Sequence, residues 1–520
     1  MKKIFTTLVA GLMISAQMTA VTPKDVCGQF DGDLNIGGAP YPNRSVYLLP
    51  GVVENTVTFV LPDFTFGKGG KLGNIVLPNI PMDANGQLTL ENATLYLDSI
   101  SERATITVVN GLEDGGVTYN SVISATDAMV LLSIAAPSLP EPIFVLFAGT
   151  AVRTNNYALT NGGFEGNWTN NEPQGWHSFG TATGLMAGFV TDNTYQFVPS
   201  TDVRPGSNGS QSALVSSNML FGVKANGNCT NGQINAGSMT ADDALNNYNF
   251  SDPENEGYNT PLNGCPDSIV FWAKYLPAKR ELANDSNKAR INAVITTAAR
   301  YQDPESGSFA DAKIGAAALN YSAVEGFGWQ RLAVPFVYEA AKADAAPAYI
   351  LTTFSTNQVP GGGTSYSTGT LTKVNVLDSV YLDDVELIYN NELSSFTISG
   401  EALTFNQHIA TVESNYCDSC VKYAAAGDGI SAQTFIAFDA QHKCIHIYVA
   451  ADNYAQSGAY NLYRVDFADS QTSDLGPIVD PTEGLEEILL NSKAEKVLLN
   501  GQVLIRRDNA LYNIMGIRVL

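Results

Sequence analysis

Short apolar runs of β type recur along most of the chain, with turn residues between them. Four of these runs fall within residues 21–153, separated by Gly, Pro, Asn and Asp. They are TVTFVL (56–61), GNIVLPNI (73–80), RATITVV (103–109) and PIFVLFAGTAV (142–152). Short strands at regular spacing with turns between them predict a closed barrel or a sandwich over this segment.

The same pattern continues over residues 154–391, but the loops between the runs are longer and more polar. One such loop is STNQVPGGGTSYSTG (355–369). The apolar runs are DSIVFWAKYL (267–276), ARINAVITTA (289–298), WQRLAVPFVY (329–338), AYILTTFST (348–356) and DSVYLDDVELIY (378–389). We expect a two-sheet jelly roll here, with functional loops at its edges.

A third, smaller β unit is predicted for residues 392–470. Its runs FTISGEALTF (396–405), QTFIAFDA (433–440), KCIHIYVAADNY (443–454) and YNLYRVDF (460–467) alternate well enough for an immunoglobulin-like sandwich. Residues 471–484 are rich in Gly, Pro and acidic residues, which indicates a linker. The pattern therefore predicts an all-β protein.

The last segment, residues 485–520, is predicted to be a small β-meander tail. Asn500-Gly501 is a strong hairpin signal between apolar runs, and Asp508-Asn509 gives a second turn. The tail resembles short C-terminal segments of exported bacterial proteins, with the match carried by the residues Tyr512, Asn513, Gly516 and Val519. The resemblance implies a sorting signal for secretion; the alternative is an added strand pair on the preceding sandwich.

The N-terminus has the pattern of a secretory signal over residues 1–20. Lys2 and Lys3 precede an apolar stretch, 4–16, that is too short to span a bilayer, and cleavage is expected near Ala20. No later segment is long and apolar enough to be a membrane span. We therefore expect an exported protein without a transmembrane segment.

Charge narrows the range of partners. The 520-residue chain has a formal net charge of −23, and only 15% of its residues are charged. Such an acidic balance disfavours a nucleic acid or an anionic membrane surface as a partner. It suits a soluble protein that binds neutral ligands or divalent cations.

Two stretches of the first segment carry a resemblance to a known fold family. CGQFDGDLNI (27–36) and FVLPDFTFGKGGKLGNIVLPNIPMD (59–83), with the closing apolar strand that ends at Val152, resemble the calycin-like, lipocalin-related barrel of exported proteins of gut bacteria. Such a barrel either encloses a small ligand or is filled by its own side chains. The filled form is the favoured interpretation.

The central segment resembles jelly-roll carbohydrate-binding modules, and more closely the PCMD family, a jelly-roll family named for carbohydrate metabolism. TNGGFEGNW (160–168) and EPQGW (172–176) carry the match at its start, and VYLDDVEL (380–387) carries it at its end. Further matching stretches are PDSIVFWAKYLP (266–277), GWQRLAVPFVY (328–338) and YILTTFSTN (349–357). The resemblance implies glycan binding.

A calcium site is predicted where the two ends of this segment meet. Alternation along a strand places Asp383 on the same face as Val385, as a carboxylate on an apolar face that needs a partner. First and last strands of a jelly roll commonly lie side by side, so Glu165 is expected near Asp383. The resemblance assigns a structural calcium to Glu165, Asp383 and Asp384, and calcium favours such oxygen ligands. The alternative is that Glu165 caps backbone N–H groups and Asp383 lies at the sheet edge.

Aromatic residues beside the loops are the candidates for sugar contacts. Trp168, Trp176 and His177 lie in or near loops, as a sugar-binding platform requires, and Asn357 could supply an amide for a sugar hydroxyl. Packing under the sheet is the alternative for Trp176. Trp272 and Trp329 fall inside strand-like runs and are expected in the core.

The six cysteines allow 15 pairings. Cys229 with Cys265 is the most natural disulfide. The set Cys417, Cys420, Cys444 and His446 has ligand types suitable for tetrahedral zinc. A disulfide from Cys444 to Cys417 or Cys420 is the favoured alternative, because export favours oxidation, so zinc is not expected as a cofactor.

No catalytic set stands out, because the chain has four histidines and lacks a P-loop or an H-E-x-x-H motif. The leading prediction is a non-catalytic protein that binds a glycan or glycoconjugate at the surface of a gut-type Gram-negative bacterium, or in its surroundings or periplasm. The first alternative is a structural adhesin or stalk protein with a protein partner. The second is a glycan-processing enzyme of the glycoside hydrolase type.

Overall fold

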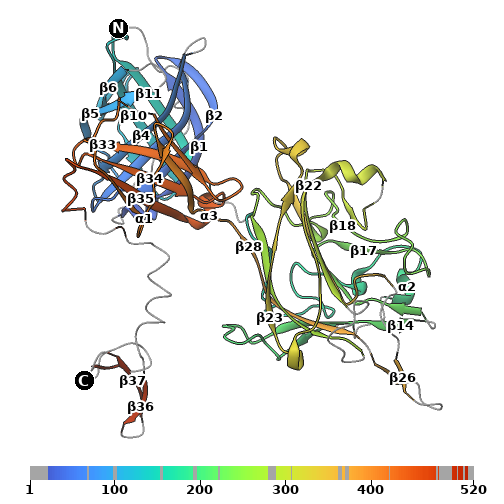
Figure 1. Cartoon of the computed structure of the whole chain (residues 1–520). Coiled ribbons are helices and arrows are strands. Elements are labelled where there is room, and N and C mark those ends of the chain that lie inside the picture. The colour runs from blue at the N-terminus through green and yellow to red at the C-terminus, as the bar shows by residue number, and fades with distance from the viewer. Residues whose placement is uncertain are drawn as a thin grey trace.

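Three β units and a short three-stranded tail make up the part of the chain that the structure describes (Figure 1). The structure is a computed structural model. It describes residues 21–66, 70–97, 102–152, 156–190, 196–220, 223–278, 288–305, 307–360, 366–368, 374–376, 378–420, 422–475, 478, 495–499, 502–507 and 510–512. The predicted signal segment 1–20 and most of the predicted linker lie outside these residues.

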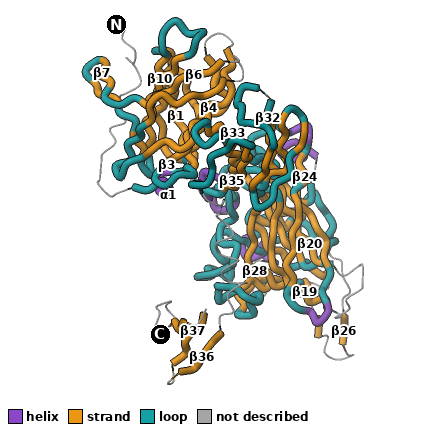
Figure 2. Tube along the Cα trace, turned by 60° about the vertical axis from the view of Figure 1, so that its left-hand side comes forward, coloured by secondary structure: helices purple, strands orange, loops and turns teal. Residues whose placement is uncertain are grey.

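The prediction of an all-β protein is confirmed, since the described helices are single turns or little more (Figure 2). These are α1 (Pro23–Val26), α2 (Ala187–Val190), α3 (Tyr454–Ser457), η1 (Phe179–Thr181), η2 (Glu256–Tyr258), η3 (Gly307–Ala312), η4 (Glu325–Phe327) and η5 (Ala340–Lys342). None of the described helices is long and apolar enough to cross a membrane.

The first unit is an antiparallel barrel that is nearly closed. Its strands are β1 (Gly28–Ile36), β2 (Ala39–Pro50), β3 (Thr56–Phe66), β4 (Gly70–Pro81), β5 (Leu90–Leu97), β6 (Glu102–Val108), β7 (Leu112–Asp114), β8 (Val117–Tyr119), β9 (Val122–Ile123), β10 (Asp127–Ala135) and β11 (Ile143–Ala151). The main sheet runs β4-β3-β2-β1-β11-β10-β6-β5. A bridge between Met82 and Leu88 brings the two outer strands together.

Side chains of the barrel strands fill its interior. Because successive side chains of a strand point to opposite faces, Ala128, Val130, Leu132 and Ile134 of β10 all point inward. They join one buried cluster with residues of the other strands, among them Phe30, Val46, Phe59, Ile75, Ile106 and Phe147.

The second unit is a sandwich of two five-stranded sheets. One sheet has the order β12 (Phe197–Ser200), β13 (Ser212–Ser216), β28 (Ser379–Ile388), β19 (Ser268–Leu276) and β23 (Gln330–Pro335). The other has the order β16 (Asn228–Thr230), β25 (Tyr349–Ser355), β20 (Ala289–Thr296), β22 (Lys313–Tyr321) and β24 (Val337–Tyr338). A buried cluster that includes Phe271, Tyr275, Ile291, Phe354 and Leu382 lies between them.

Smaller strands are attached to this sandwich. They are β14 (Asn218–Leu220) with β15 (Val223–Ala225), β17 (Gln233–Ala236) with β18 (Asn247–Phe250) and β21 (Gln302–Asp303), and β26 (Tyr366–Thr368) with β27 (Val374–Val376). Val294 and Leu351, on the outer side of the second sheet, pack with Tyr301 and Ala312. The β17–β18–β21 sheet thus covers part of that outer side.

The third unit has two small sheets around its own core. They are β30 (Glu401–Ala402), β29 (Leu393–Ile398) and β32 (Tyr423–Gly427), and β31 (Ile409–Val412), β35 (Tyr460–Phe467), β34 (Cys444–Ala450) and β33 (Gln433–Asp439). β31 and β35 pair in parallel, and the other ladders of the unit are antiparallel. Ile445, Ile447 and Val449 face the core between the two sheets.

The other face of the four-stranded sheet packs on the barrel wall. Tyr448 and Ala450 lie in one buried cluster with barrel residues Leu49, Val60 and Val76. The hydroxyl of Tyr448 lies 3.0 Å from that of Thr58. As a result every residue of β34 is buried, and Figures 1 and 2 both show the third unit against the barrel.

The tail forms the antiparallel meander β36 (Glu495–Leu499), β37 (Gln502–Arg507) and β38 (Ala510–Tyr512). Its strands flank the two predicted turns at residues 500–501 and 508–509, which themselves lie outside the described residues. Of the residues that resemble a sorting segment, Tyr512 ends β38, and Asn513, Gly516 and Val519 lie outside the described residues.

Candidate functional site

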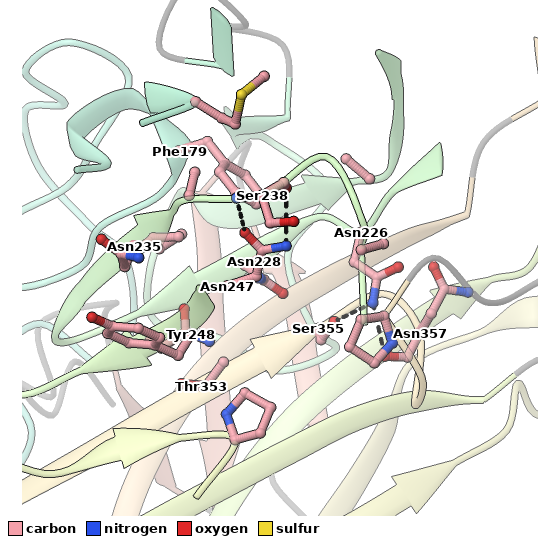
Figure 3. Close-up of a pocket in the computed structure, with 18 of the residues that line it drawn as sticks. Phe179, Asn226, Asn228, Asn235, Ser238, Asn247, Tyr248, Thr353, Ser355 and Asn357 are labelled. Atoms are coloured by element: carbon pink, nitrogen blue, oxygen red, sulfur yellow. Dashed lines mark hydrogen bonds between the residues drawn. The ribbon is translucent and has the colours of Figure 1, made fainter. Parts of the chain in front are cut away.

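A cavity of about 300 Å³ lies on the outer side of the second sandwich sheet, beneath the segments that cover it (Figure 3). This volume is at the lower end of the range for small-molecule sites, roughly 300–1,000 Å³. The floor comes from β16, β20 and β25, and the cover comes from η1, α2, β17, β18 and the connections between them. The described residues that line the cavity include Phe179, Met186, Phe189, Asn226, Asn228, Asn235, Met239, Asn247, Tyr248, Asn249, Arg290, Thr353, Ser355 and Asn357.

The floor is polar because of strand alternation. On β25, Phe354 points into the sandwich core, so Thr353 and Ser355 on either side of it point to the cavity. On β16, Cys229 is in the core and Asn228 lines the cavity. The same two strands therefore stabilise the sandwich with one face and build the site with the other.

The cover is held in shape by an asparagine. The side chain of Asn247 accepts hydrogen bonds from the backbone N–H groups of Gly237 (3.1 Å) and Ser238 (3.0 Å). Its amide donates to the carbonyls of Ser238 (3.0 Å) and Thr240 (2.8 Å). These four bonds fix the loop after β17, which carries Met239 at the cavity.

Two further asparagines present acceptors that the protein leaves unused. The amide of Asn226 donates to Ser355 Oγ (3.3 Å) and to the carbonyl of Asn357 (3.4 Å), as Figure 3 shows. Its Oδ1 atom is buried and has no hydrogen-bond partner among the described residues, and the same holds for Asn249 Oδ1. Buried acceptors without partners are costly, so these two lining residues keep hydrogen-bonding capacity that the described protein groups do not use.

Asn357, predicted as a ligand residue, does line the cavity. Its own amide is already engaged, because Nδ2 donates to Asp378 Oδ2 at 3.0 Å. Its Oδ1 accepts from Ser217 Oγ (3.2 Å) and Thr356 Oγ1 (3.1 Å). The buried side chain therefore holds the edge of the cavity in place.

The cavity carries almost no net charge. Among the described residues that line it, Arg290 is the one with a charged side chain. Its guanidinium forms two bonds to Asp303, at 3.0 and 2.9 Å, and this carboxylate raises the pKa of Arg290. Because this pair is neutral as a whole, the cavity suits an uncharged polar ligand.

Apolar groups complete the lining. The rings of Phe179 and Tyr248 face the same space as the amides. At the mouth, Phe189 is 56% exposed and Met239 is 46% exposed. Exposed large apolar side chains at the edge of a cavity mark a binding surface.

The three residues predicted as an aromatic platform lie elsewhere. Trp176 is buried in the sandwich core, with its Nε1 donating to the carbonyl of Asn161 at 3.1 Å, so its predicted ligand role is corrected to a core role. Trp168 is half-buried and packs on Phe197, with 4.9 Å between ring centroids. His177 is held between Glu172 (3.1 Å) and the carbonyl of Gly257 (2.8 Å).

Trp272 and Trp329, predicted as core residues, lie half-buried on the outer face of the first sheet. The guanidinium of Arg204 lies 5.5 Å from the ring centre of Trp272. The Nε1 atom of Trp329 donates to Asp202 at 3.1 Å. Their long rings therefore cover this sheet from the solvent side, which sequence alternation alone did not distinguish from the core side.

The carboxylates predicted to bind calcium have protein partners. Asp383 accepts from the backbone N–H of Arg204 at 3.0 Å, and the Arg204 side chain pairs with Asp384. Glu165 accepts from the N–H groups of Ser210 and Gln211, both at 2.8 Å. An arginine and backbone amides thus bind most of these oxygens, while Asp383 Oδ1 has no partner among the described residues. The bonds of Glu165 match its capping alternative, and the calcium site stays a prediction.

A β-bulge explains why the predicted face of Asp383 is wrong. The pairing of β28 with β19 shifts register between the Val270 and Trp272 positions, and Asp384 has a φ of 44°. The bulge inserts one residue, so Val385 faces the core while Asp383 lies opposite Trp272. Residues 159–168, at the start of the sandwich, form a loop instead of the expected first strand. This loop contacts β28, because the Val385 N–H donates to the carbonyl of Gly162 at 2.9 Å.

The cysteine predictions also need correction. Cys229 and Cys265 are free thiols, since Cys229 points into the sandwich core while Cys265 lies near the third unit. The disulfide that is present joins Cys417 to Cys420, and Cys444 is free. Cys444 and His446 remain neighbours, with 3.6 Å between Sγ and Nε2.

Comparison with known proteins gives little further information. No family model and no curated protein matches the chain. Among solved structures, one match is a Bacteroides fragilis protein described as a "putative outer membrane protein". The sequence identity is 15%, the alignment covers 25% of this chain and 52% of that chain, and the TM-score is 0.15. Another match is the glycoside hydrolase domain of Endo-D from Streptococcus pneumoniae. The sequence identity is 10%, the alignment covers 54% of this chain and 38% of that chain, and the TM-score is 0.15. The chain thus spans about half or less of each, and these likenesses carry no argument about function.

Sequence reasoning missed most of the cavity, although a signal was present. Asparagine is dense in the stretches KANGNCTNGQINAG (224–237) and NNYN (246–249), which supply many of the lining amides. Such density beside Tyr248 is unusual for a plain connecting loop. What the sequence did not show is that these stretches fold back over the outer face of β25.

Proposed function

We propose that the protein binds an uncharged glycan, or the glycan of a glycoconjugate, in the cavity on the outer side of the second sandwich sheet. The observation that carries the proposal is the lining itself, which combines exposed apolar and aromatic surface with several amides and two buried unpaired acceptors. Sugars have apolar ring faces and many hydroxyl donors, so they match both parts of this lining. The resemblance of the central segment to jelly-roll carbohydrate-binding modules supports the same proposal.

The proposal is for binding without hydrolysis. The described residues that line the cavity include no Asp, Glu or His, whereas glycoside hydrolysis needs a pair of carboxyl groups on opposite sides of the bond. The charged side chain of the described lining, Arg290, is bound to Asp303. We further propose that the protein is exported and acts at the cell surface, as the N-terminal pattern suggests.

A glycan-array screen of the full chain tests the proposal, with variants that remove exposed lining groups. Phe189→Ala and Tyr248→Ala should each weaken binding by about fivefold, since an aromatic contact is worth roughly 1 kcal/mol. Val337→Ala is the matched control, because Val337 is 74% exposed in the same unit and does not line the cavity. The control should bind as the wild type does.

Three results would contradict the proposal. Binding that survives Phe189→Ala and Tyr248→Ala but is lost in Trp168→Ala would move the site to the loop at Trp168. Absence of glycan binding, together with capture of a defined surface protein, would favour an adhesin. Release of reducing sugar from the bound glycan would show an enzyme.

A further inference from the structure

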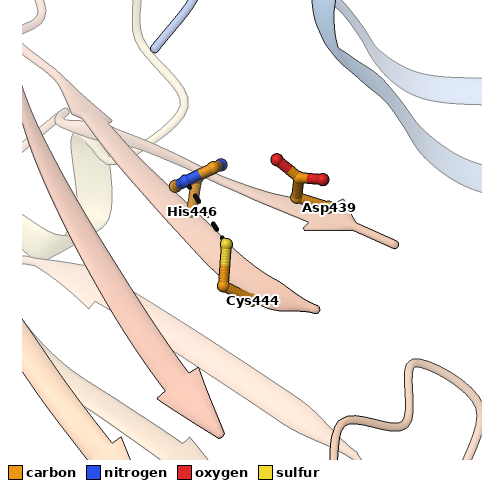
Figure 4. A group of neighbouring side chains, drawn as sticks. All are labelled: Asp439, Cys444 and His446. Atoms are coloured by element: carbon orange, nitrogen blue, oxygen red, sulfur yellow. Dashed lines mark hydrogen bonds between the residues drawn. The ribbon is translucent and has the colours of Figure 1, made fainter. Parts of the chain in front are cut away.

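Three potential metal ligands lie on one side of the β33–β34 hairpin. Asp439, the last residue of β33, pairs directly across from Cys444, the first residue of β34. His446 is two residues further along β34 and therefore shares the face of Cys444. Figure 4 shows the carboxylate, the thiol and the imidazole projecting from the same side of the two strands.

Ligand atoms of the three residues converge on one small space. One ligand atom from each residue lies within 4.8 Å of the other two, and Cys444 Sγ lies 3.6 Å from His446 Nε2. Zinc bonds of about 2.3 Å to sulfur and about 2.0 Å to nitrogen, at a tetrahedral angle, place these two atoms about 3.5 Å apart. The two ligands on β34 therefore already have the spacing that a shared zinc ion requires.

The trio is buried, and the protein does not fully satisfy it. All three side chains are excluded from solvent, and Nδ1 of His446 has no hydrogen-bond partner among the described residues. Nε2 is the ring nitrogen that lies beside Cys444 Sγ, and the unused Nδ1 shows that protein groups do not fully hydrogen-bond this buried imidazole.

We propose that Asp439, Cys444 and His446 bind one zinc ion at the junction of the third unit and the barrel. A carboxylate, a thiolate and a neutral imidazole suit zinc better than the hard cations Ca²⁺ and Mg²⁺. The two anionic ligands balance the +2 charge of the ion. Nε of the neighbouring Arg464 donates to Asp466 Oδ1 at 2.8 Å. This ion pair is neutral as a whole, so it does not change the charge balance at the trio.

Groups around the trio hold the carboxylate in place. His442 Nδ1 lies 2.7 Å from Asp439 Oδ2, and the backbone N–H groups of Gln441 and His442 donate to Oδ1. His442 Nε2 lies in turn 3.5 Å from Asp474. Partners of this kind orient metal ligands and tune their affinity. Asn79 of the barrel reaches Asp439 Oδ2 at 3.3 Å, a long contact that a metal bond could replace.

The position of the trio gives the ion a structural role. The cluster lies on the same face of the sheet as Tyr448, which packs on the barrel wall. Because β4 carries Asn79, an ion held by the hairpin would stiffen the strands that form this contact. Metal binding to a folded site adds its binding free energy to stability, so removal of zinc should weaken the packing of the third unit on the barrel.

The first experiment measures metal in an untagged full chain by mass spectrometry. We expect about one zinc per chain in the wild type. Cys444→Ser should lose it, and the matched control Cys229→Ser, which changes another buried free thiol, should keep it. The double variant Cys417→Ser and Cys420→Ser should also keep it, which distinguishes this trio from the set predicted from sequence.

The second experiment does not depend on a variant that folds. After chelation of the wild type, one equivalent of Co²⁺ should give the visible absorption of a tetrahedral thiolate complex, and zinc should displace it and raise the melting temperature. No zinc in the purified chain together with no Co²⁺ spectrum would overturn the proposal. Zinc retained in Cys444→Ser would show an adventitious ion only, and would overturn it as well.

Discussion

Asp383 offers the sharpest test of the packing between the two ends of the sandwich. Its side chain is 1% exposed, one oxygen accepts from the N–H of Arg204, and the other has no partner among the described residues. Burial, with a smaller contribution from Asp384, raises its pKa from 3.8 to about 6. The perturbation is Asp383→Asn, which keeps the shape and removes the charge.

The direction in which stability changes with pH follows from proton linkage. Because the folded state holds the proton more tightly than the unfolded state, stability falls as pH rises from about 3.8 to about 6, and it stays lower above that range. A shift of about two pKa units corresponds to about 3 kcal/mol at neutral pH. Asp383→Asn should therefore stabilise the sandwich by up to about 3 kcal/mol at pH 7.5 and by little near pH 3.5.

Tryptophan fluorescence during urea denaturation measures this effect in the correct unit. All four tryptophans, at positions 168, 176, 272 and 329, belong to the sandwich. The matched control is Asp384→Asn, which removes the ion pair with Arg204 and should not stabilise. A difference between Asp383→Asn and the wild type that does not change with pH would refute the reasoning. Stabilisation of the wild type by Ca²⁺ that Asp383→Asn abolishes would refute it too, and would restore the calcium prediction.

Three further predictions concern packing and covalent links. Trp176→Ala removes a fully buried core ring, so it should cost about 3–5 kcal/mol in the same fluorescence assay. Arg103→Ala leaves the buried carboxylate of Asp418 without its barrel partner, whose Nη1 lies 3.0 Å from Asp418 Oδ2. The loss should cost about 1–2 kcal/mol because Arg103 itself is half-exposed, and faster proteolysis of the third unit would reveal it. Reduction of the Cys417–Cys420 disulfide should cost about 2 kcal/mol at most, because this disulfide closes a very short loop. A fall in melting temperature that corresponds to a larger loss of stability would contradict the expectation.

The fold could be predicted further than the site. Alternation and turn signals gave the all-β class and the approximate position of many strands, because both depend on residues close in sequence. The alternation rule failed at Asp384, where one inserted residue with positive φ turns the following side chains to the other face. A bulge of this kind depends on the pairing with β19, and the sequence of β28 alone does not show it.

Site predictions failed for a related reason. Trp176 and the thiol of Cys229 look available in the sequence, yet both point into the sandwich core. Asn357 lines the cavity, but its own amide is engaged with Asp378, and its role toward a ligand stays a prediction. Whether a side chain faces core, cavity or solvent depends on what packs over its strand.

The amino-acid sequence by itself determined the local features of this protein: an acidic β-rich chain, short strands with turns between them, and asparagine-rich stretches beside Tyr248. Only the tertiary structure decided that η1, α2, β17 and β18 cover β25 to make a cavity, and that the barrel buries the second face of β34. It also decided that Asp439 lies opposite Cys444 and His446. Local patterns fix backbone preference over a few residues, whereas these arrangements depend on contacts between segments far apart in the chain.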